Sequence, residues 1–176
     1  MKIELKNLKH AEFASQETNC FTASVYIDGT LALTADNDGR GGDTCLWEKN
    51  RGSGALAKLE SYAATIPPRK TPFKDPKHPT GFFHYQMTAS GLVDELVTQN
   101  LMSRDMRKAL KRTTVFALEW TTGTRVREMV KLPWNDENKS IARAYLNKHY
   151  PDGYIVLNDL PEEEAFLIWK ESEEAA

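Results

Sequence analysis

A glycine-rich segment, TADNDGRGGDT (34–44, the glycine loop), holds the residue types with which a backbone surrounds an anion or a metal ion. Its carboxylates Asp36 and Asp38 are followed by three closely spaced glycines. Glycines allow successive N–H groups to point into one concavity, where Arg40 would assist an anion. The same residue types also build tight turns. The segment therefore predicts either a structural turn or a ligand loop that uses Asp38 and Arg40, and both interpretations stay open.

Two well-known loop motifs do not fit this segment. A calcium loop of the EF-hand type needs an oxygen ligand at its fifth position and a glutamate at its twelfth. Counted from Asp36, those positions hold Arg40 and Trp47. A nucleotide phosphate loop ends in Gly-Lys-Ser/Thr, whereas Gly42 is followed here by Asp43. Neither motif is indicated.

A second candidate site is a run of cations on a predicted helix. Four of them recur at i, i+3, i+4 and i+7, which is one helical face: Arg104, Arg107, Lys108 and Lys111 (the basic face). Like charges at this spacing repel each other, so an acidic group should offset them. That group is either an acidic partner, protein or nucleic acid, or the acidic C-terminal segment of the chain itself.

The charge distribution makes both explanations reasonable. Residues 101–150 hold 11 Lys/Arg against 5 Asp/Glu, a net charge of +6. Residues 151–176 hold 1 against 8, a net charge of −7. The whole chain has a net charge of −2, so it is not a polycation that seeks nucleic acid as a whole.

Histidine and cysteine do not form a ligand pattern. The four histidines are scattered, and the two cysteines, Cys20 and Cys45, are too few for a disulfide scaffold. Cys45 would need a nearby base and an orienting group to act as a nucleophile. We expect no metal, no cofactor and no catalytic residue, which favours a binding protein over an enzyme and leaves the enzyme alternative open.

The stretch HPTGFFHY (78–85) places three aromatic residues beside two histidines. Aromatic side chains usually belong to the core because they bury large areas. If Phe82 or Phe83 is exposed, the stretch becomes a candidate hot spot for a partner.

The elements that position these residues follow from periodicity. Strands are predicted at 2–8 and across 20–35, where Asp28-Gly29 forms a two-residue hairpin turn. A helix is predicted at 53–66 with Ser53 as its N-cap. Further helices are predicted at 90–101, 103–111, 139–149 and from Pro161, and further strands at 113–120, 124–132 and 154–158. Ile141, Ala144 and Tyr145 are the expected core residues of the helix at 139–149.

Segment 67–81 contains five prolines and is predicted to be a long, irregular connection. It separates an N-terminal hairpin, glycine loop and helix (1–66) from a C-terminal part (82–176). The frequent hairpins indicate an α+β fold with mixed or antiparallel pairing, four to five helices and one main domain.

Length and composition support a globular chain. The chain has 176 residues, of which 40% are hydrophobic. No segment resembles a secretory signal or approaches the ~20 apolar residues that a membrane span needs. We expect a soluble, cytoplasmic protein with no membrane contact.

At CFTASVYIDGT, NDGRGG and SGLVDELV, the chain resembles a group of small uncharacterised proteins from bacteriophages and bacterial genomes, which pair an N-terminal hairpin with an NDG-x-GG loop. The resemblance covers roughly the first half, with a weaker likeness at KALKRTTVFAL and ARAYLNKHYPD. The Asp43-Thr44-Cys45 sequence departs from the group, in which a cysteine lies nearer the glycines. The resemblance implies a phage or mobile-element setting, and no activity.

Three functional hypotheses follow. The first is an accessory binding protein that contacts and modulates a host macromolecule, with a host or phage protein as the expected partner and anti-defence activity as one form. The second is a nucleic-acid-binding protein that uses the basic face. The third is a nucleotide- or phosphate-binding protein, or an enzyme, that uses the glycine loop.

Overall fold

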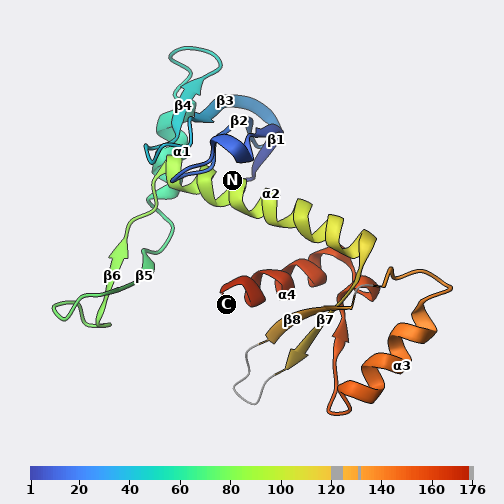
Figure 1. Ribbon diagram of the computed structural model, residues 1–176. Coiled ribbons are helices and arrows are strands. Elements are labelled where there is room, and N and C mark those ends of the chain that lie inside the picture. The colour runs from blue at the N-terminus through green and yellow to red at the C-terminus, as the bar shows by residue number, and fades with distance from the viewer. Residues whose placement is uncertain (120–124, 131, 175–176) are drawn as a thin grey trace. The chain divides into compact units, whose positions relative to one another are not determined.

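The computed structural model describes residues 1–119, 125–130 and 132–174 (Figure 1). Within these ranges, nine strands and four α-helices form antiparallel sheets and their covering layers, which confirms the predicted α+β class. The chain divides into two compact units, Met1–Gln99 (unit 1) and Asn100–Ala176 (unit 2). The division falls within helix α2 (Ala89–Arg112) and not in the proline-rich segment.

Unit 1 is built on a four-stranded antiparallel sheet. Strands β1 (Ile3–His10), β2 (Phe21–Ile27), β3 (Thr30–Asn37) and β4 (Cys45–Glu48) lie in sequence order. A short 3-10 helix, η1 (Glu12–Ala14), connects β1 to β2.

The predicted hairpin between β2 and β3 is confirmed. Asp28 (φ 48°) and Gly29 (φ 82°) both have positive φ, as a two-residue turn of this hand requires. Alternate side chains of the two strands, among them Val25 and Leu33, are fully buried. Among the described residues of unit 1, Leu59 and Ala63 of helix α1 and Ala89, Val93 and Val97 of α2 are also fully buried.

Helix α1 (Ala55–Ala63) is shorter than predicted, and the expected N-cap, Ser53, is wrong. The N-cap is Gly54, which has a left-handed backbone. The carboxylate of Glu48 satisfies nearby N–H groups by accepting from Leu56 (3.1 Å) and from Gly52 (2.9 Å). The N–H of Leu56 is the main cause that holds the pKa of Glu48 below its usual range. Glu48 of the preceding strand thus shares the capping with Ser53, whose Oγ accepts a hydrogen bond from the N–H of Ala55 (3.4 Å).

Segment 67–81 is not an irregular connection, and this prediction was wrong. Strand β5 (Arg69–Lys74) pairs with β6 (Phe82–Tyr85) in a two-stranded antiparallel sheet. Figure 1 shows this hairpin extending away from the four-stranded sheet of unit 1. The pairing tolerates proline because the register is irregular between Lys70 and Lys74, where Pro72 lies.

Helix α2 is continuous over 24 residues, whereas the sequence predicts two helices that separate near Ser103. Serine does not end a helix without a following glycine or proline, and the Oγ of Ser103 accepts a hydrogen bond from Arg107. The apolar spacing also continues, since Met106 is fully buried and Met102 and Ala109 pack beside it.

Unit 2 has a three-stranded sheet in the order β8-β7-β9, made of β7 (Thr114–Glu119), β8 (Arg125–Val130) and β9 (Ile155–Val156). The 3-10 helix η2 (Leu157–Asp159) occupies the rest of the strand predicted at 154–158. The turn predicted around Thr122-Gly123 lies outside the described residues.

Helices cover both faces of this sheet. Val115 and Ala117 of β7 form a core with Met106 of α2 and with Ala165 and Trp169 of helix α4 (Glu162–Glu174), which begins after Pro161 as predicted. The alternate residue, Phe116, packs on the opposite face with Leu146 of helix α3 (Lys139–His149).

The predicted core residues of α3 were wrong. Ile141 is 60% exposed, Tyr145 is 44% exposed and Ala144 is exposed as well, while Ala142 and Leu146 are fully buried. Both pairs satisfy the i, i+4 spacing of a helix, so periodicity alone did not distinguish the two neighbouring rows. The exposed row is therefore an apolar surface that the unit does not cover.

Among the helices of the described ranges, none combines the length and the apolar character that crossing a bilayer requires.

Candidate functional site

The glycine loop is organised around the buried side chain of Asn37. Its Oδ1 accepts hydrogen bonds from Thr18 Oγ1 and from the N–H of Gly39, both at 2.8 Å. Its Nδ2 donates to the carbonyl of Gly42 (2.9 Å) and to Thr44 Oγ1 (3.1 Å). Every polar atom of the amide group is therefore used to hold the loop in one conformation.

Three N–H groups of the loop that a bound anion would need already have partners. The N–H of Gly39 is bound to Asn37, that of Arg40 to the carboxylate of Asp38 (3.1 Å), and that of Gly41 to Thr18 (3.3 Å). Of the two predicted ligand residues, Asp38 thus stabilises the turn itself, and Arg40 is exposed. These contacts support a structural turn over a ligand loop.

The loop is also tied to α2 within unit 1. Thr44 Oγ1, which accepts from Asn37, donates to the carboxylate of Asp94. Burial raises the pKa of Asp94, the hydrogen bond from Thr44 opposes this rise, and the charge of Asp43 adds to it. No local pattern predicts the role of Asp94, because its partner lies 50 positions earlier in the chain.

We expect the stability of the protein to carry a pH dependence from Asp94. Because its folded pKa is raised, the folded state holds this proton more tightly than the unfolded chain. Protonated Asp94 therefore contributes stability that is fully present below about pH 3.9, the usual pKa of aspartate. This contribution is lost as the pH rises through the pKa of Asp94 in the folded state. Asp94→Asn should stabilise the protein more at pH 7 than at pH 3, measured by urea unfolding at both pH values.

Thr44→Val is the companion variant for this measurement. It removes the hydrogen bond that opposes the rise in the pKa of Asp94. The contribution of Asp94 to stability should therefore fall more between pH 3 and pH 7 than it does in the wild type. An Asp94→Asn variant whose pH dependence matches that of the wild type would contradict the assignment.

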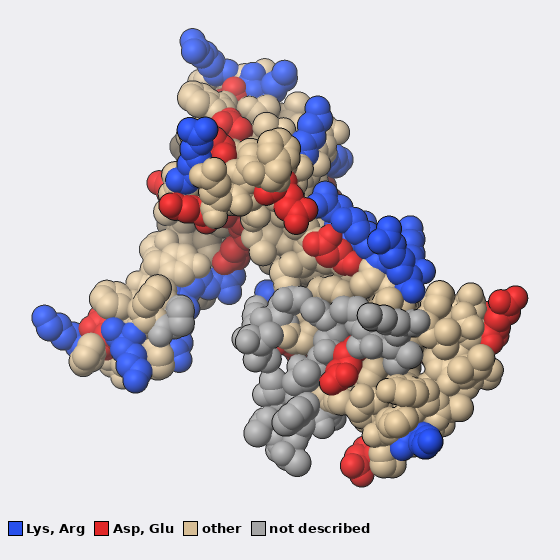
Figure 2. Space-filling model, in the orientation of Figure 1, with Lys and Arg blue, Asp and Glu red and all other residues tan. Residues whose placement is uncertain are grey.

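The basic face lies on the unit 2 part of α2, and its four side chains are exposed (Figure 2). Arg107 Nε pairs with Glu162 of α4 at 2.9 Å, and Lys108 pairs with Asp105 on the same helix at 3.1 Å. Among the described residues, neither Arg104 nor Lys111 makes an ion pair or a side-chain hydrogen bond. The acidic C-terminal segment therefore neutralises the basic face at Arg107, while two of its four cations stay open.

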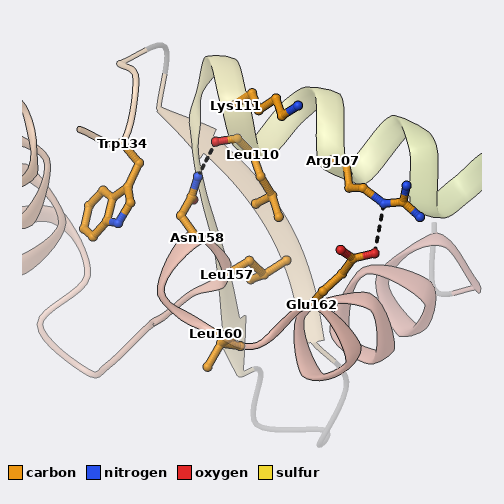
Figure 3. A pocket seen from close by; sticks show the side chains of 8 residues that line it. All are labelled: Arg107, Leu110, Lys111, Trp134, Leu157, Asn158, Leu160 and Glu162. Atoms are coloured by element: carbon orange, nitrogen blue, oxygen red, sulfur yellow. Dashed lines mark hydrogen bonds and ion pairs between the residues drawn. The ribbon is translucent and has the colours of Figure 1, made fainter.

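A pocket of about 340 Å³ adjoins the basic face within unit 2 (Figure 3). Arg107 and Lys111 line it from α2, Glu162 and Leu160 from the start of α4, and Trp134 from the segment before α3. The pocket thus combines two cations, one carboxylate and one indole ring.

The floor of this pocket is fixed by Asn158. Its Nδ2 donates to the carbonyls of Leu110 (2.8 Å) and Thr113 (2.9 Å), and its Oδ1 accepts from the N–H of Val115 (2.7 Å). The side chain of Asn158 joins the end of α2 to β7 and η2 and thereby positions Lys111, which immediately follows Leu110.

Trp134 is held by a second polar cluster that sequence reasoning missed. Its Nε1 donates to Asp159 (2.9 Å), which also pairs with Arg143 at 2.7 Å, and the guanidinium of Arg143 lies 5.4 Å from the centroid of the Trp134 ring. A cation near an aromatic ring attracts it. The orientation of this indole is therefore fixed before any ligand arrives.

Cys45 begins a strand, not a helix, and neither it nor Cys20 forms a disulfide. Within the described ranges, no three His, Cys, Asp or Glu side chains gather in a way that could hold a metal ion. No protein-family model, curated protein or solved structure matches this chain.

Proposed function

We propose that this chain is a nucleic-acid-binding protein whose contact surface is the basic face of α2. One observation carries the proposal: Arg104 and Lys111 stay exposed and have no ion-pair partner among the described residues, although residues 151–176 of the same unit contain eight carboxylates. Open cations on a helical face form the electrostatic surface that phosphates bind. The adjoining pocket adds the indole of Trp134 to the same surface.

Among the described residues, Arg107 is the cation of this face that pairs with the acidic segment. Both partners of the Arg107–Glu162 pair are more than half exposed, so the pair contributes only about 0–1 kcal/mol. Such a contact is weak enough for a phosphate to replace Glu162. Glu162 then acts as a mild competitor for the ligand, and removal of its charge should strengthen binding.

This role of Glu162 is better tested by a point variant than by truncation. A chain that ends after Asn158 would lose Ala165, Ile168 and Trp169, all buried in the core of unit 2, and would not fold. Glu162→Gln keeps the helix and removes the charge. A loss of affinity in Glu162→Gln would show that Glu162 holds Arg107 in position for the ligand and does not compete with it.

Arg104→Ala combined with Lys111→Ala is expected to weaken nucleic-acid binding and to change its salt dependence. Each phosphate contact releases counterions, so the slope of log K against log salt should become shallower by about two. Fluorescence anisotropy with labelled DNA at several salt concentrations measures both effects. Arg107 is avoided as a target because its substitution would also expose Glu162.

Lys148→Ala is the matched control, because Lys148 is also exposed and lies in the last turn of a unit 2 helix. Its salt slope should equal that of the wild type. Binding that is insensitive to salt, or the same slope in all three proteins, would rule out phosphate contacts at the basic face.

A protein partner is the second candidate, and the exposed row of α3 favours it. Ile141 and Tyr145 are apolar surface that unit 2 leaves uncovered. With the phage-like resemblance, this row supports an accessory protein that contacts and modulates a host protein. Ile141→Asp should then abolish a complex that wild-type protein recovers from host lysate, while Lys148→Ala should keep it. Equal recovery by both variants would exclude this surface.

A further inference from the structure

The β5–β6 hairpin of unit 1 carries three exposed aromatic side chains. Phe73 is 70% exposed, Phe83 53% and Tyr85 47%. Phe83 and Tyr85 are two residues apart on β6 and so point to the same side. Lys74 pairs with Phe82, which points to the other side, so Phe73 returns to the side of Phe83. These three residues form one surface, the aromatic face of the hairpin.

Cations are frequent in this hairpin, although Lys70 and Lys74 point to the side opposite the aromatic face. The segment 69–85 contains four of them and a single carboxylate, Asp75: Arg69, Lys70, Lys74 and Lys77. On the opposite side of the hairpin, Lys70 Nζ lies 3.6 Å from the centroid of the Phe82 ring. Aromatic rings and ammonium groups therefore lie within the same short strands.

The hairpin is a built structure and not a loose connection. The N–H of Asp75 donates to the carbonyl of Gly81 (3.0 Å), and the N–H of Gly81 donates to that of His78 (2.8 Å). The ring of His78 stacks on that of His84, with centroids 4.3 Å apart. At its base, Arg69 pairs with Glu95 of α2 at 3.2 Å. These contacts hold the turn and the base of the hairpin that carries the exposed rings.

Exposure of these rings needs an explanation beyond the fold. In the described part of the chain, this sheet has only two strands, so it has no further strand on either edge. An isolated two-stranded hairpin is at best marginally stable, and burial of its aromatic residues would stabilise it. Their exposure to solvent favours a ligand that packs against the faces of these rings.

We propose that the aromatic face of the hairpin binds single-stranded nucleic acid by stacking bases on Phe73, Phe83 and Tyr85, while the lysines of the same hairpin contact phosphates. Charge complementarity selects this ligand, because exposed rings in a segment with four cations and one carboxylate match the bases and phosphates of a single strand. A duplex keeps the faces of its bases hidden, so it offers nothing to stack. The inference rests on the proposed function for the class of ligand and adds a second contact surface in the other unit.

Phe83→Ala in the full chain is the first test, with labelled oligothymidylate of about 20 nucleotides as the probe. Affinity should fall about tenfold, because stacking contributes that much per base. The salt slope should stay at its wild-type value, since stacking releases no counterions. Tyr85→Ala should lose affinity in the same way. Phe83→Trp, which keeps an aromatic ring, should bind the oligonucleotide as the wild type does. Affinity for a duplex of the same length should not change in any of these variants.

Phe13→Ala is the matched control. Phe13 is 94% exposed in the same unit but lies in η1, outside the hairpin, and its removal should leave affinity unchanged. Lys74→Ala should show the opposite signature to Phe83→Ala, with a salt slope shallower by about 0.7.

Wild-type affinity of both Phe83→Ala and Tyr85→Ala for the oligonucleotide would overturn this inference. If the variant with Arg104→Ala and Lys111→Ala still binds nucleic acid more weakly than the wild type, the proposed function stays intact. Loss of affinity in the hairpin variants alone would support this inference and would contradict the basic face as a contact surface. If these variants instead lose a self-association seen in light scattering, with no change in affinity for the oligonucleotide, the hairpin is an interface between two copies and the inference is wrong.

Discussion

Replacement of Gly39 by alanine is expected to lower the free energy of unfolding by about 4 kcal/mol. Gly39 has a φ of +84°, which costs any other residue backbone strain. An added Cβ would also overlap the carbonyl oxygen of Ala14 and lie 2.9 Å from the Cβ of Cys20. Neither neighbour can easily move away, because Ala14 donates its N–H to Ala11 and Cys20 is bound to Ser15 and Ala11 by its N–H and its carbonyl.

Gly29 provides a matched control for this variant. Its φ of +82° is almost the same, but a Cβ there would meet nothing within 4 Å. Gly29→Ala should therefore cost only the strain of about 1–2 kcal/mol. The difference between the two variants in urea unfolding measures the overlap alone. Equal losses would mean that η1 and β2 move aside, and that the glycine loop is less tightly enclosed than the structure shows.

Asn158→Ala is expected to destabilise unit 2 by about 3 kcal/mol. The substitution leaves the carbonyls of Leu110 and Thr113 and the N–H of Val115 without their partner, and each unsatisfied buried group costs about 1–3 kcal/mol unless water replaces it. Asn158→Asp should lose more at neutral pH, because a carboxylate would face two carbonyl oxygens. Hydrogen exchange followed by mass spectrometry would localise the loss to the end of α2 and to β7.

Asn147→Ala tests whether this loss is specific. Asn147 makes one exposed hydrogen bond, from Tyr154 Oη at 2.9 Å, so its removal should cost less than about 1 kcal/mol. A similar loss in both asparagine variants would show that Asn158 does not organise the pocket floor.

The sequence predicts features that depend on neighbouring residues. The β2–β3 hairpin follows from alternating apolar residues around Asp28-Gly29, and both signals lie within about 16 positions. The basic face follows from helical spacing alone. The charge distribution also raised the acidic C-terminal segment as a candidate to offset it, and Glu162 does pair with Arg107.

Features that depend on tertiary contacts were not predictable in this way. Nothing in the spacing of Ile141, Ala142, Tyr145 and Leu146 tells which row of α3 meets Phe116. The β5–β6 hairpin was not predicted, because proline disfavours strands. An irregular register that tolerates proline cannot be recognised from residue propensities. The side chains of Asn37 and Asn158 each make several hydrogen bonds that join separate segments. Local spacing does not predict such a role, because the burial of a polar residue depends on segments that are distant in the sequence.

The continuity of α2 has a consequence for how the chain folds. Formation of the first helical turn is the costly step, and each later residue adds to an existing helix at little cost. Once Val93 and Val97 are buried in unit 1, the residues after Asn100 can extend a helix that is already nucleated. Unit 1 thus supplies the nucleus for the helix on which the core of unit 2 assembles. The two units share one folding event at this helix, although each has a core of its own.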